Sequence, residues 1–238
     1  MMAGEEVFRS GTLALPTTPW EDLAQVPAWT DLTVNRVLCL VAVALMVANL
    51  LDYFRLFPYL LYCVDRSRGA EDLEHSIGLA RVRNLSATLY VLPFCLVLDR
   101  FALARPAFWS AIPAAWSVPA TVGLLCAYML VRDLCYLFFR PRRVHGEAFA
   151  TLRHNPFNYL LLLAPVLFVT VAVIMVGHLP PTLARYILTG EIALAWLHAI
   201  LRSGQILRKR CSGLSTILYL CALEFLPAAL LVAVVMFF

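Results

Sequence analysis

The amino-acid sequence predicts an all-α fold, a polytopic transmembrane helical bundle of about six spans with the N-terminus and the C-terminus both outside. Two observations lead to this fold class. The chain of 238 residues is 62% hydrophobic and only 14% charged, whereas soluble domains have about 45–50% apolar and about 25% charged residues. The hydrophobic residues are also gathered into six stretches, at positions 34–57, 84–98, 111–139, 155–177, 182–201 and 214–238, and most of these are long enough for a helix to cross a bilayer.

The residues before these stretches are expected to form an extracytoplasmic tail over positions 1–33, followed by one membrane domain over 34–238. Within the tail, Thr18, Pro19 and Glu21 have the spacing of a capping box with proline at the first helical position, which predicts a short interfacial helix. No continuous apolar core follows a basic start, so no cleavable signal peptide is expected.

Two later segments carry local signals of helix position. Residues 71–83 place Leu73 and Ile77 on one helical face, which predicts an interfacial helix between the first two spans. Asn155 is followed by Pro156. This pair predicts the start of the fourth helix, because asparagine is a frequent N-cap and proline is favoured at the first helical position.

The basic residues of the loops predict the orientation of the bundle. Lysine and arginine are in excess in cytoplasmic loops. The first, third and fifth connections and their edges are rich in these residues, while the second and fourth are poor in them. The odd connections are therefore expected inside, which places both termini outside. The basic residues of the odd connections are Arg55, Arg66, Arg68, Arg81, Arg83, Arg140, Arg142, Arg143, Arg153, Arg202, Arg208, Lys209 and Arg210.

A single carboxylate, Glu224, lies near the centre of the last hydrophobic stretch. It is at least ten residues from either end of that stretch, so its carboxyl is expected roughly 15 Å from the nearer interface. An acid at that depth costs about 2.5–3.5 kcal/mol on insertion scales and usually faces a protein interior. Cys221 and Pro227 lie three residues before and after it, on the same expected helix face. Pro227 should kink the helix beside the acid.

Glu191 is the second acid within a hydrophobic stretch. The fifth and sixth stretches form a hairpin joined by residues 202–213, and this places Glu191 at the same expected depth as Glu224. If the two side chains face each other, they would share one proton, because two adjacent carboxylates in a low dielectric cannot both ionise cheaply. The alternatives are that each acid is protonated and hydrogen-bonded to a neighbouring helix, or that the two face apart or out to lipid.

Other polar side chains complete the candidate intramembrane site. Arg132 is expected either to reach the cytoplasmic headgroups or to turn inward and pair with one of the two acids. Asn158 could form a hydrogen bond between helices. His198 lies seven residues after Glu191 on the same face, where a packed histidine is more common than a haem ligand. Arg202 is expected to end the fifth helix, where a cation is favourable.

Several kinds of chemistry have no support in the sequence. The seven cysteines are scattered singly, and no Cys/His ligand spacing is present, so neither a disulfide framework nor a metal site is expected. No phosphate-binding glycine loop or serine elbow occurs. No cofactor and no catalytic residues are therefore predicted, and the balance is against an enzyme. The net charge of +4 is too small to suggest nucleic-acid binding.

Three segments of the chain resemble a known family. These are ILYLCALEFLP at 217–227, HNPFNYLLLLAP at 154–165 and LHAILRSGQIL at 197–207. In them the chain resembles a bacterial integral-membrane domain-of-unknown-function family, number 4271, of the Bacteroidetes type. The resemblance implies an inner-membrane protein of unassigned activity, and it marks Tyr219, Cys221, Glu224 and Pro227 as family-like positions.

Three functions are compatible with these observations. The first is a structural or accessory subunit of a bacterial inner membrane, binding another envelope protein, a second copy or membrane lipids through its helices. Its basis is the lack of a catalytic set. The second is a small proton- or ion-coupled carrier that uses Glu191 and Glu224. The third is a membrane enzyme acting on a lipid or an isoprenoid.

Overall fold

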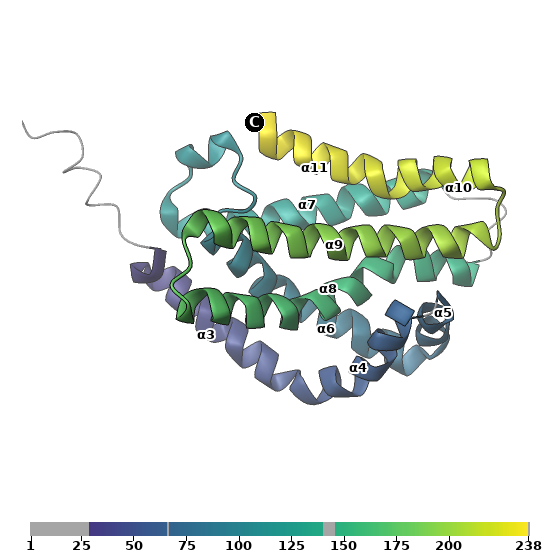
Figure 1. The fold of residues 1–238 in the computed structure, drawn as a ribbon, viewed down its shortest axis with the longest axis horizontal. Coiled ribbons are helices and arrows are strands. Elements are labelled where there is room, and N and C mark those ends of the chain that lie inside the picture. Colours follow the sequence, from purple (N-terminus) through teal and green to yellow (C-terminus); the bar gives the residue numbers. More distant parts are fainter. Residues whose placement is uncertain (1–28, 66, 140–145, 238) are drawn as a thin grey trace, which may run out of the picture.

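Every regular element of the described residues, which are 29–65, 67–139 and 146–237, is helical in the computed structural model (Figure 1). The all-α prediction is confirmed for this part of the chain. The capping box expected at residues 18–21 lies outside it. In chain order the elements are η1 (Trp29–Asp31), α3 (Thr33–Ala48), α4 (Leu50–Asp65), α5 (Ser67–His75), α6 (Ile77–Arg100), η2 (Ala107–Ala111), η3 (Ala114–Trp116), α7 (Ser117–Phe138), α8 (Gly146–Val176), α9 (Pro181–Arg208), α10 (Gly213–Leu220), η4 (Cys221–Phe225) and α11 (Leu226–Phe237).

Four helical segments of the described chain are long and apolar enough to cross a membrane, and the bent pair α3–α4 would make a fifth. The chain therefore has the helices of a membrane protein. The four segments are Ile77–Arg100, Ala114–Phe138, Ala148–Val176 and Gly213–Val235. The long helix α9 is not among them, since Arg185, Glu191, His198 and Arg202 lower its hydropathy.

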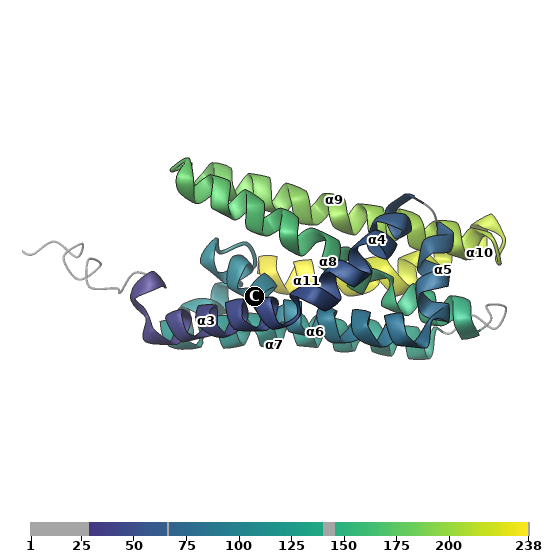
Figure 2. The ribbon, with the colours of Figure 1, turned by 90° about the horizontal axis from the view of Figure 1, so that it is seen from below.

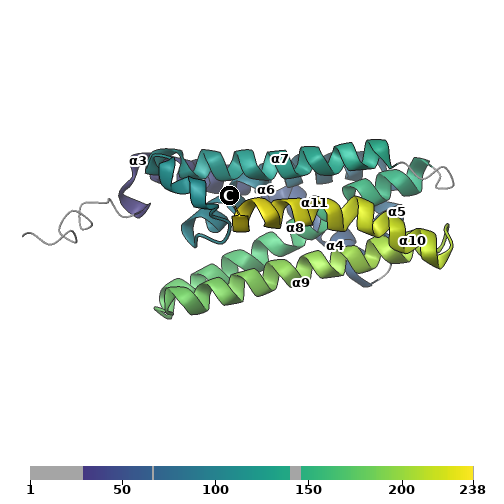
Figure 3. The same cartoon turned by 90° about the horizontal axis from the view of Figure 1, so that it is seen from above.

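The long helices run side by side along the longest axis of the molecule (Figures 1 and 2). Helix α8 is central, because it packs against α5, α6 and α9. Helix α7 lies beside α11, and α9 lies beside α8 on the outside of the bundle (Figure 3). The start of α3 and the C-terminus are at one end, and α5 is at the other. Consecutive long helices therefore alternate in direction.

The first predicted span is broken in the structure. The sequence predicts one stretch over 34–57, whereas α3 ends at Ala48 and α4 leaves it at an angle of 67°. At the break, the buried side chain of Asn49 accepts a hydrogen bond of 3.2 Å from the Ser86 hydroxyl of α6.

The interfacial helix predicted over 71–83 is also divided in two. Helix α5 ends at His75 and α6 begins at Ile77. Leu73 is fully buried in a cluster with residues of α4, α6 and α8, whereas Ile77 is 81% exposed. The two residues do not share a face because α5 folds back over α6, where Glu74 binds Arg83. Helix α5 therefore covers one end of the bundle.

Two prolines lie inside α8, one of which, Pro156, was predicted to mark a helix start. Helix α8 begins at Gly146, so the prediction that Asn155 caps its start is wrong and Pro156 is internal. An internal proline leaves the carbonyl four residues earlier without its usual N–H donor. For Pro165 that carbonyl belongs to Leu161, and the buried Tyr53 hydroxyl of α4 donates to it at 3.3 Å. The bundle thus uses a freed carbonyl to join α4 to α8.

Candidate functional site

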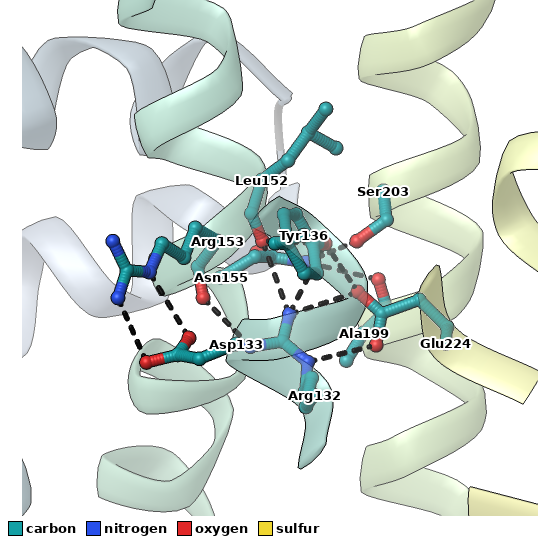
Figure 4. Close-up of polar contacts among 9 residues, drawn as sticks. All are labelled: Arg132, Asp133, Tyr136, Leu152, Arg153, Asn155, Ala199, Ser203 and Glu224. Carbon is teal, nitrogen blue, oxygen red and sulfur yellow. Dashed lines mark hydrogen bonds and ion pairs between the residues drawn. The ribbon is translucent and has the colours of Figure 1, made fainter. Parts of the chain in front are cut away.

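Glu224 forms the most buried ion pair of the described residues with Arg132 of α7 (Figure 4). The exposed fractions of their side chains are 4% and 1%. Arg132 donates from Nη2 to Oε1 at 2.9 Å and from Nε to Oε2 at 3.3 Å. Tyr136, one turn further along α7, donates from its hydroxyl to Oε1 at 2.8 Å. Of the two alternatives left by the sequence, Arg132 thus turns inward, and both carboxylate oxygens have donors.

The remaining donors of Arg132 bind backbone carbonyls of α8. Nη1 donates to the carbonyl of Arg153 at 2.8 Å, and Nη2 also lies 3.3 Å from the carbonyl of Leu152. Leu152 lies four residues before Pro156, so the proline removes the N–H that its carbonyl would otherwise accept. The proline ring also crowds that turn of the helix and opens it toward α7. The internal proline therefore supplies the guanidinium with one of its two carbonyl acceptors, that of Leu152.

The side chains of residues 153–155 of α8 form hydrogen bonds with three other helices. Consecutive residues point in different directions around a helix, so residues 153–155 reach α7, α5 and α9 in turn. Together with the carbonyls that bind Arg132, these contacts make the segment 152–155 the polar centre of the bundle. The contacts are Arg153 to Asp133 at 3.0 and 2.8 Å, His154 to Glu74 at 3.1 Å, and Asn155 to the Ala199 carbonyl at 2.9 Å and to Ser203 Oγ at 3.0 Å.

Glu74 receives hydrogen bonds from two basic residues at the end of the bundle that α5 covers. Arg83 Nη1 donates to it at 2.7 Å, and His154 does so from Nδ1 when that nitrogen carries the proton. Arg83 is fully buried and also donates to Asn84 Oδ1. Burial alone would raise the pKa of Glu74, but the hydrogen bonds and charges of His154 and Arg83 outweigh burial and lower it from 4.5 to about 2.

The lowered pKa of Glu74 predicts that the stability of the folded chain depends on pH. Because the pKa of Glu74 is lower in the folded chain, its ionised form contributes stability that is complete above about pH 4.5 and is lost as the pH falls toward 2. We expect the thermal unfolding temperature in detergent to fall between pH 5 and pH 3 in the parent protein, and to fall less in Glu74→Gln. Glu71→Gln is the matched control in α5, since the ion pair that Glu71 makes with a described residue, Lys209 at 3.6 Å, is partly exposed. Identical acid profiles of Glu74→Gln and the parent would contradict the prediction.

The helix that carries Glu224 contains a π-helical turn, η4, directly before Pro227. The N–H of Leu226 bonds to the carbonyl of Cys221, five residues earlier. This turn places Glu224 and Pro227 in the interior and Cys221 on the outside. The prediction that all three share one face is wrong, because a π turn holds more residues than an α turn and rotates the positions before it. The sequence predicted a kink at Pro227, and the irregularity that the structure has beside the acid is this π turn.

Glu191 does not meet Glu224. It lies in α9 beside α8, where Thr170 Oγ1 is 2.5 Å from Glu191 Oε1. The equal depth predicted for the two acids is wrong because α9 continues past Arg202 to Arg208, which moves the turn along the chain. The ring of Trp196 consequently lies 5.6 Å from the ring of Phe225. Glu191 is displaced from Glu224 by about six residues, or roughly 9 Å along the helix.

The remaining predicted site residues lie apart from Glu224. His198 packs its ring 5.6 Å from that of Tyr159, and Tyr219 is half-buried beside the cluster around Tyr136. The bond between helices expected from Asn158 is made by Asn155, and Asn158 Oδ1 is buried without a hydrogen-bond partner. Arg202 lies inside α9 instead of ending it, and donates to the carbonyls of Val64 and Asp65 at the end of α4.

Sequence reasoning missed Tyr136 as a partner of Glu224 and the two carbonyls as partners of Arg132. Tyr136 lies four residues after Arg132, so helical spacing would have placed it on the same face. The carbonyls of Leu152 and Arg153 carry no sequence signal of their own, and an internal Pro156 would have pointed only to that of Leu152. Glu74 and Arg83 were assigned to an interfacial segment and to loop charge.

No group of three or more His, Cys, Asp or Glu side chains in the described parts of the chain is arranged to hold a metal ion. Comparison with protein-family models, with curated proteins and with solved structures gave no match to the chain. The arrangement around Glu224 is therefore interpreted from its own geometry. It can hold a buried charge pair and fix α7, α8 and η4 relative to one another, since all three elements supply atoms to the same guanidinium.

Proposed function

We propose that this chain is a multi-pass protein of a bacterial inner membrane with a structural or accessory role. In this role it binds another envelope protein, a second copy of itself or membrane lipid through its outer helix faces. The observation that carries the proposal is the geometry of Arg132 and Glu224. Besides binding each other, Glu224 accepts a hydrogen bond from Tyr136, and Arg132 donates to two carbonyls of α8. A pair held in this way favours fixed helix positions over ion transport.

Six spans with both termini outside are part of the proposal. Helix α9 would be the additional span, because it has 28 residues and lies beside α8 for much of its length. The start of α3 and the C-terminus lie at one end, as an even number of spans requires. The turn after α9 carries Lys209 and Arg210 at the opposite end, which the preference of basic residues for the cytoplasm would place inside.

The faces available for a partner or lipid are on α7 and on the last helix. Only 17% of the apolar window of each of these two segments is buried within the bundle, against 56% for α6. On α7, Leu130, Leu137 and Phe138 are exposed apolar side chains. Apolar faces of this kind suit acyl chains or another transmembrane helix, and the ion pair of Arg132 and Glu224 lies on the protected side of the same helices.

A carrier is the second candidate, favoured by the π turn at Glu224. Such turns are frequent at functional sites, and rewinding the turn would move the carboxylate relative to Arg132. Proteoliposomes loaded with a pH-sensitive dye distinguish the two functions. We expect no proton or cation flux above that of protein-free vesicles. Flux that is abolished by Glu224→Gln in a folded protein would overturn the accessory role.

Topology and partner are tested in two further measurements. Alkaline phosphatase fused after Phe238 should be active and green fluorescent protein fused there should be dark, because this end is proposed to lie outside. Fusions in the turn after Lys209 should give an inactive phosphatase and a fluorescent protein. Opposite sides for the C-terminus and the N-terminus would show an odd number of spans. Native mass spectrometry from lipid nanodiscs should detect a stoichiometric companion, a dimer or retained phospholipid, and a bare monomer would contradict the accessory role.

A further inference from the structure

Glu191 is held very differently from Glu224. Glu224 has two bonds from a guanidinium and one from a tyrosine hydroxyl. Glu191 has one hydrogen-bond partner among the described residues, Thr170, and its second oxygen, Oε2, is buried without any partner. An ionised carboxylate needs far more support than one hydroxyl when it is removed from water. A neutral carboxylic acid needs only that one, because a threonine hydroxyl can accept from it as well as donate to it.

The surroundings of Glu191 contain no compensating charge. On α9 its neighbours Leu188 and Ile192 belong to an apolar cluster with residues of α6 and α8. No ion pair to Glu191 is formed by any described residue. The closest charged or titratable groups in its own helix are Tyr186, which is 78% exposed, Arg185, which donates to the carbonyl of Phe101, and His198, which packs against Tyr159. All three are more than one helical turn away.

The pair of Glu191 and Thr170 lies at the rim of the contact between α8 and α9. Both residues are half-buried. Exposed apolar side chains flank them on both helices, Val169 and Val173 on α8 and Leu194 on α9. Helix α9 is on the outside of the bundle in both side views (Figures 2 and 3). The carboxyl therefore lies just beneath an apolar outer face, with Oε2 itself buried, and a hydrophobic molecule dissolved in the bilayer would approach it between these side chains.

We propose that Glu191 is a proton-binding site facing the lipid, occupied by its proton in the membrane, while Glu224 is the ionised structural acid. The inference goes beyond the accessory role and depends on α9 being the additional span of the proposed topology. It assigns to this chain one exchangeable proton within the membrane, on Oε1 or Oε2 of Glu191, with Thr170 as its hydrogen-bond partner.

A hydrophobic carbodiimide, N,N′-dicyclohexylcarbodiimide, tests this assignment in proteoliposomes of the full chain. In the reaction the acid proton passes to one carbodiimide nitrogen while the carboxyl oxygen bonds to the central carbon. The resulting O-acylisourea rearranges to a stable N-acylurea that peptide mass spectrometry locates. We expect labelling at Glu191 and none at Glu224 in the same sample, so that Glu224 is an internal control. Labelling at Glu224 alone or at neither residue would overturn the proposal.

Two controls separate failure of the site from failure of the topology. Glu191→Gln should remove the label. Thr170→Val should keep it, since the valine removes only the hydrogen-bond partner of the acid. Loss of the label in a folded Thr170→Val protein would contradict a lipid-facing acid. A cationic, water-soluble carbodiimide should not reach Glu191 in intact proteoliposomes. If the water-soluble reagent labels Glu191 to the same extent as the hydrophobic one, α9 lies in water. Both the sixth span and the proton site are then refuted. If neither reagent labels it, only the site fails.

Discussion

Arg132→Met should destabilise the protein by about 3–5 kcal/mol, because removing one partner of a buried ion pair leaves the other charge uncompensated. Glu224 would keep only the Tyr136 hydroxyl as a donor. The carbonyls of Leu152 and Arg153 would also lose the guanidinium that binds them. Unfolding by a denaturing detergent, followed by tryptophan fluorescence in mild-detergent micelles, measures the loss of folding free energy.

A double-mutant cycle shows whether this loss comes from the pair itself. Glu224→Leu alone should be similarly harmful, since the buried guanidinium of Arg132 would then have no counter-charge. The combined change should be less harmful than the sum of the two, because replacing a whole buried pair by apolar residues is often close to neutral. Arg153→Met is the control, as its pair with Asp133 is 48% and 47% exposed and should contribute at most about 1 kcal/mol. Equal losses in Arg132→Met and Arg153→Met would contradict the prediction.

The second large effect is expected at the other end of the bundle, at Asp99. Its side chain is fully buried at the end of α6 and accepts from Trp29 Nε1 at 2.6 Å and from the Ser117 hydroxyl. Arg105 lies 3.6 Å away. Asp99→Ala should cost about 3–5 kcal/mol, since hydrogen bonds to a charged group contribute about 1.5–3 kcal/mol each and both donors would lose their acceptor.

The indole of Trp29, one of five tryptophans in the chain, gives this prediction a second readout. In Asp99→Ala, Trp29 is released from its hydrogen bond, so the fraction of tryptophan fluorescence that a water-soluble quencher removes should rise together with the loss of stability. Asp99→Asn should lie between the alanine variant and the parent because one oxygen acceptor remains. The matched control is Asp52→Ala, whose partner Arg55 is 77% exposed. A change at Asp99 no larger than this control would show that the cluster does not join η1, α6 and α7.

The hydrophobic pattern predicted the all-α fold and its long apolar helices, because both follow from the cost of placing polar groups in hydrocarbon. That cost also predicted that Glu224 faces the interior, which its burial confirms. It could not select the partner. Arg132 has a side chain long enough to reach either the headgroups or the interior, and in the interior it binds the carbonyls of Leu152 and Arg153, of which Pro156 frees the first.

Three errors have a common physical origin in helix continuity. The chain continues as helix through Asn155 and Pro156 and through Arg202, where local signals indicated ends. It breaks instead at Asn49, where an apolar stretch indicated none. In each case packing between helices outweighed local preference, as for the bond from Asn155 to Ser203 and the bond from Ser86 to Asn49. Such contacts join residues far apart in the chain, and a single sequence does not show them.

The capture of α8 backbone oxygens by Arg132 has a consequence for how the chain can vary. Main-chain oxygens are common to all amino acids, so exchanging the residue at 152 or 153 leaves the acceptors for the guanidinium in place. Their direction depends instead on the count of residues along the helix. Deleting one residue between 146 and 151 would leave them where they are relative to Pro156, whereas one deletion between 153 and 155 would turn them about 100° from the proline-opened side. The number of residues in this short segment is therefore more tightly constrained than their identity.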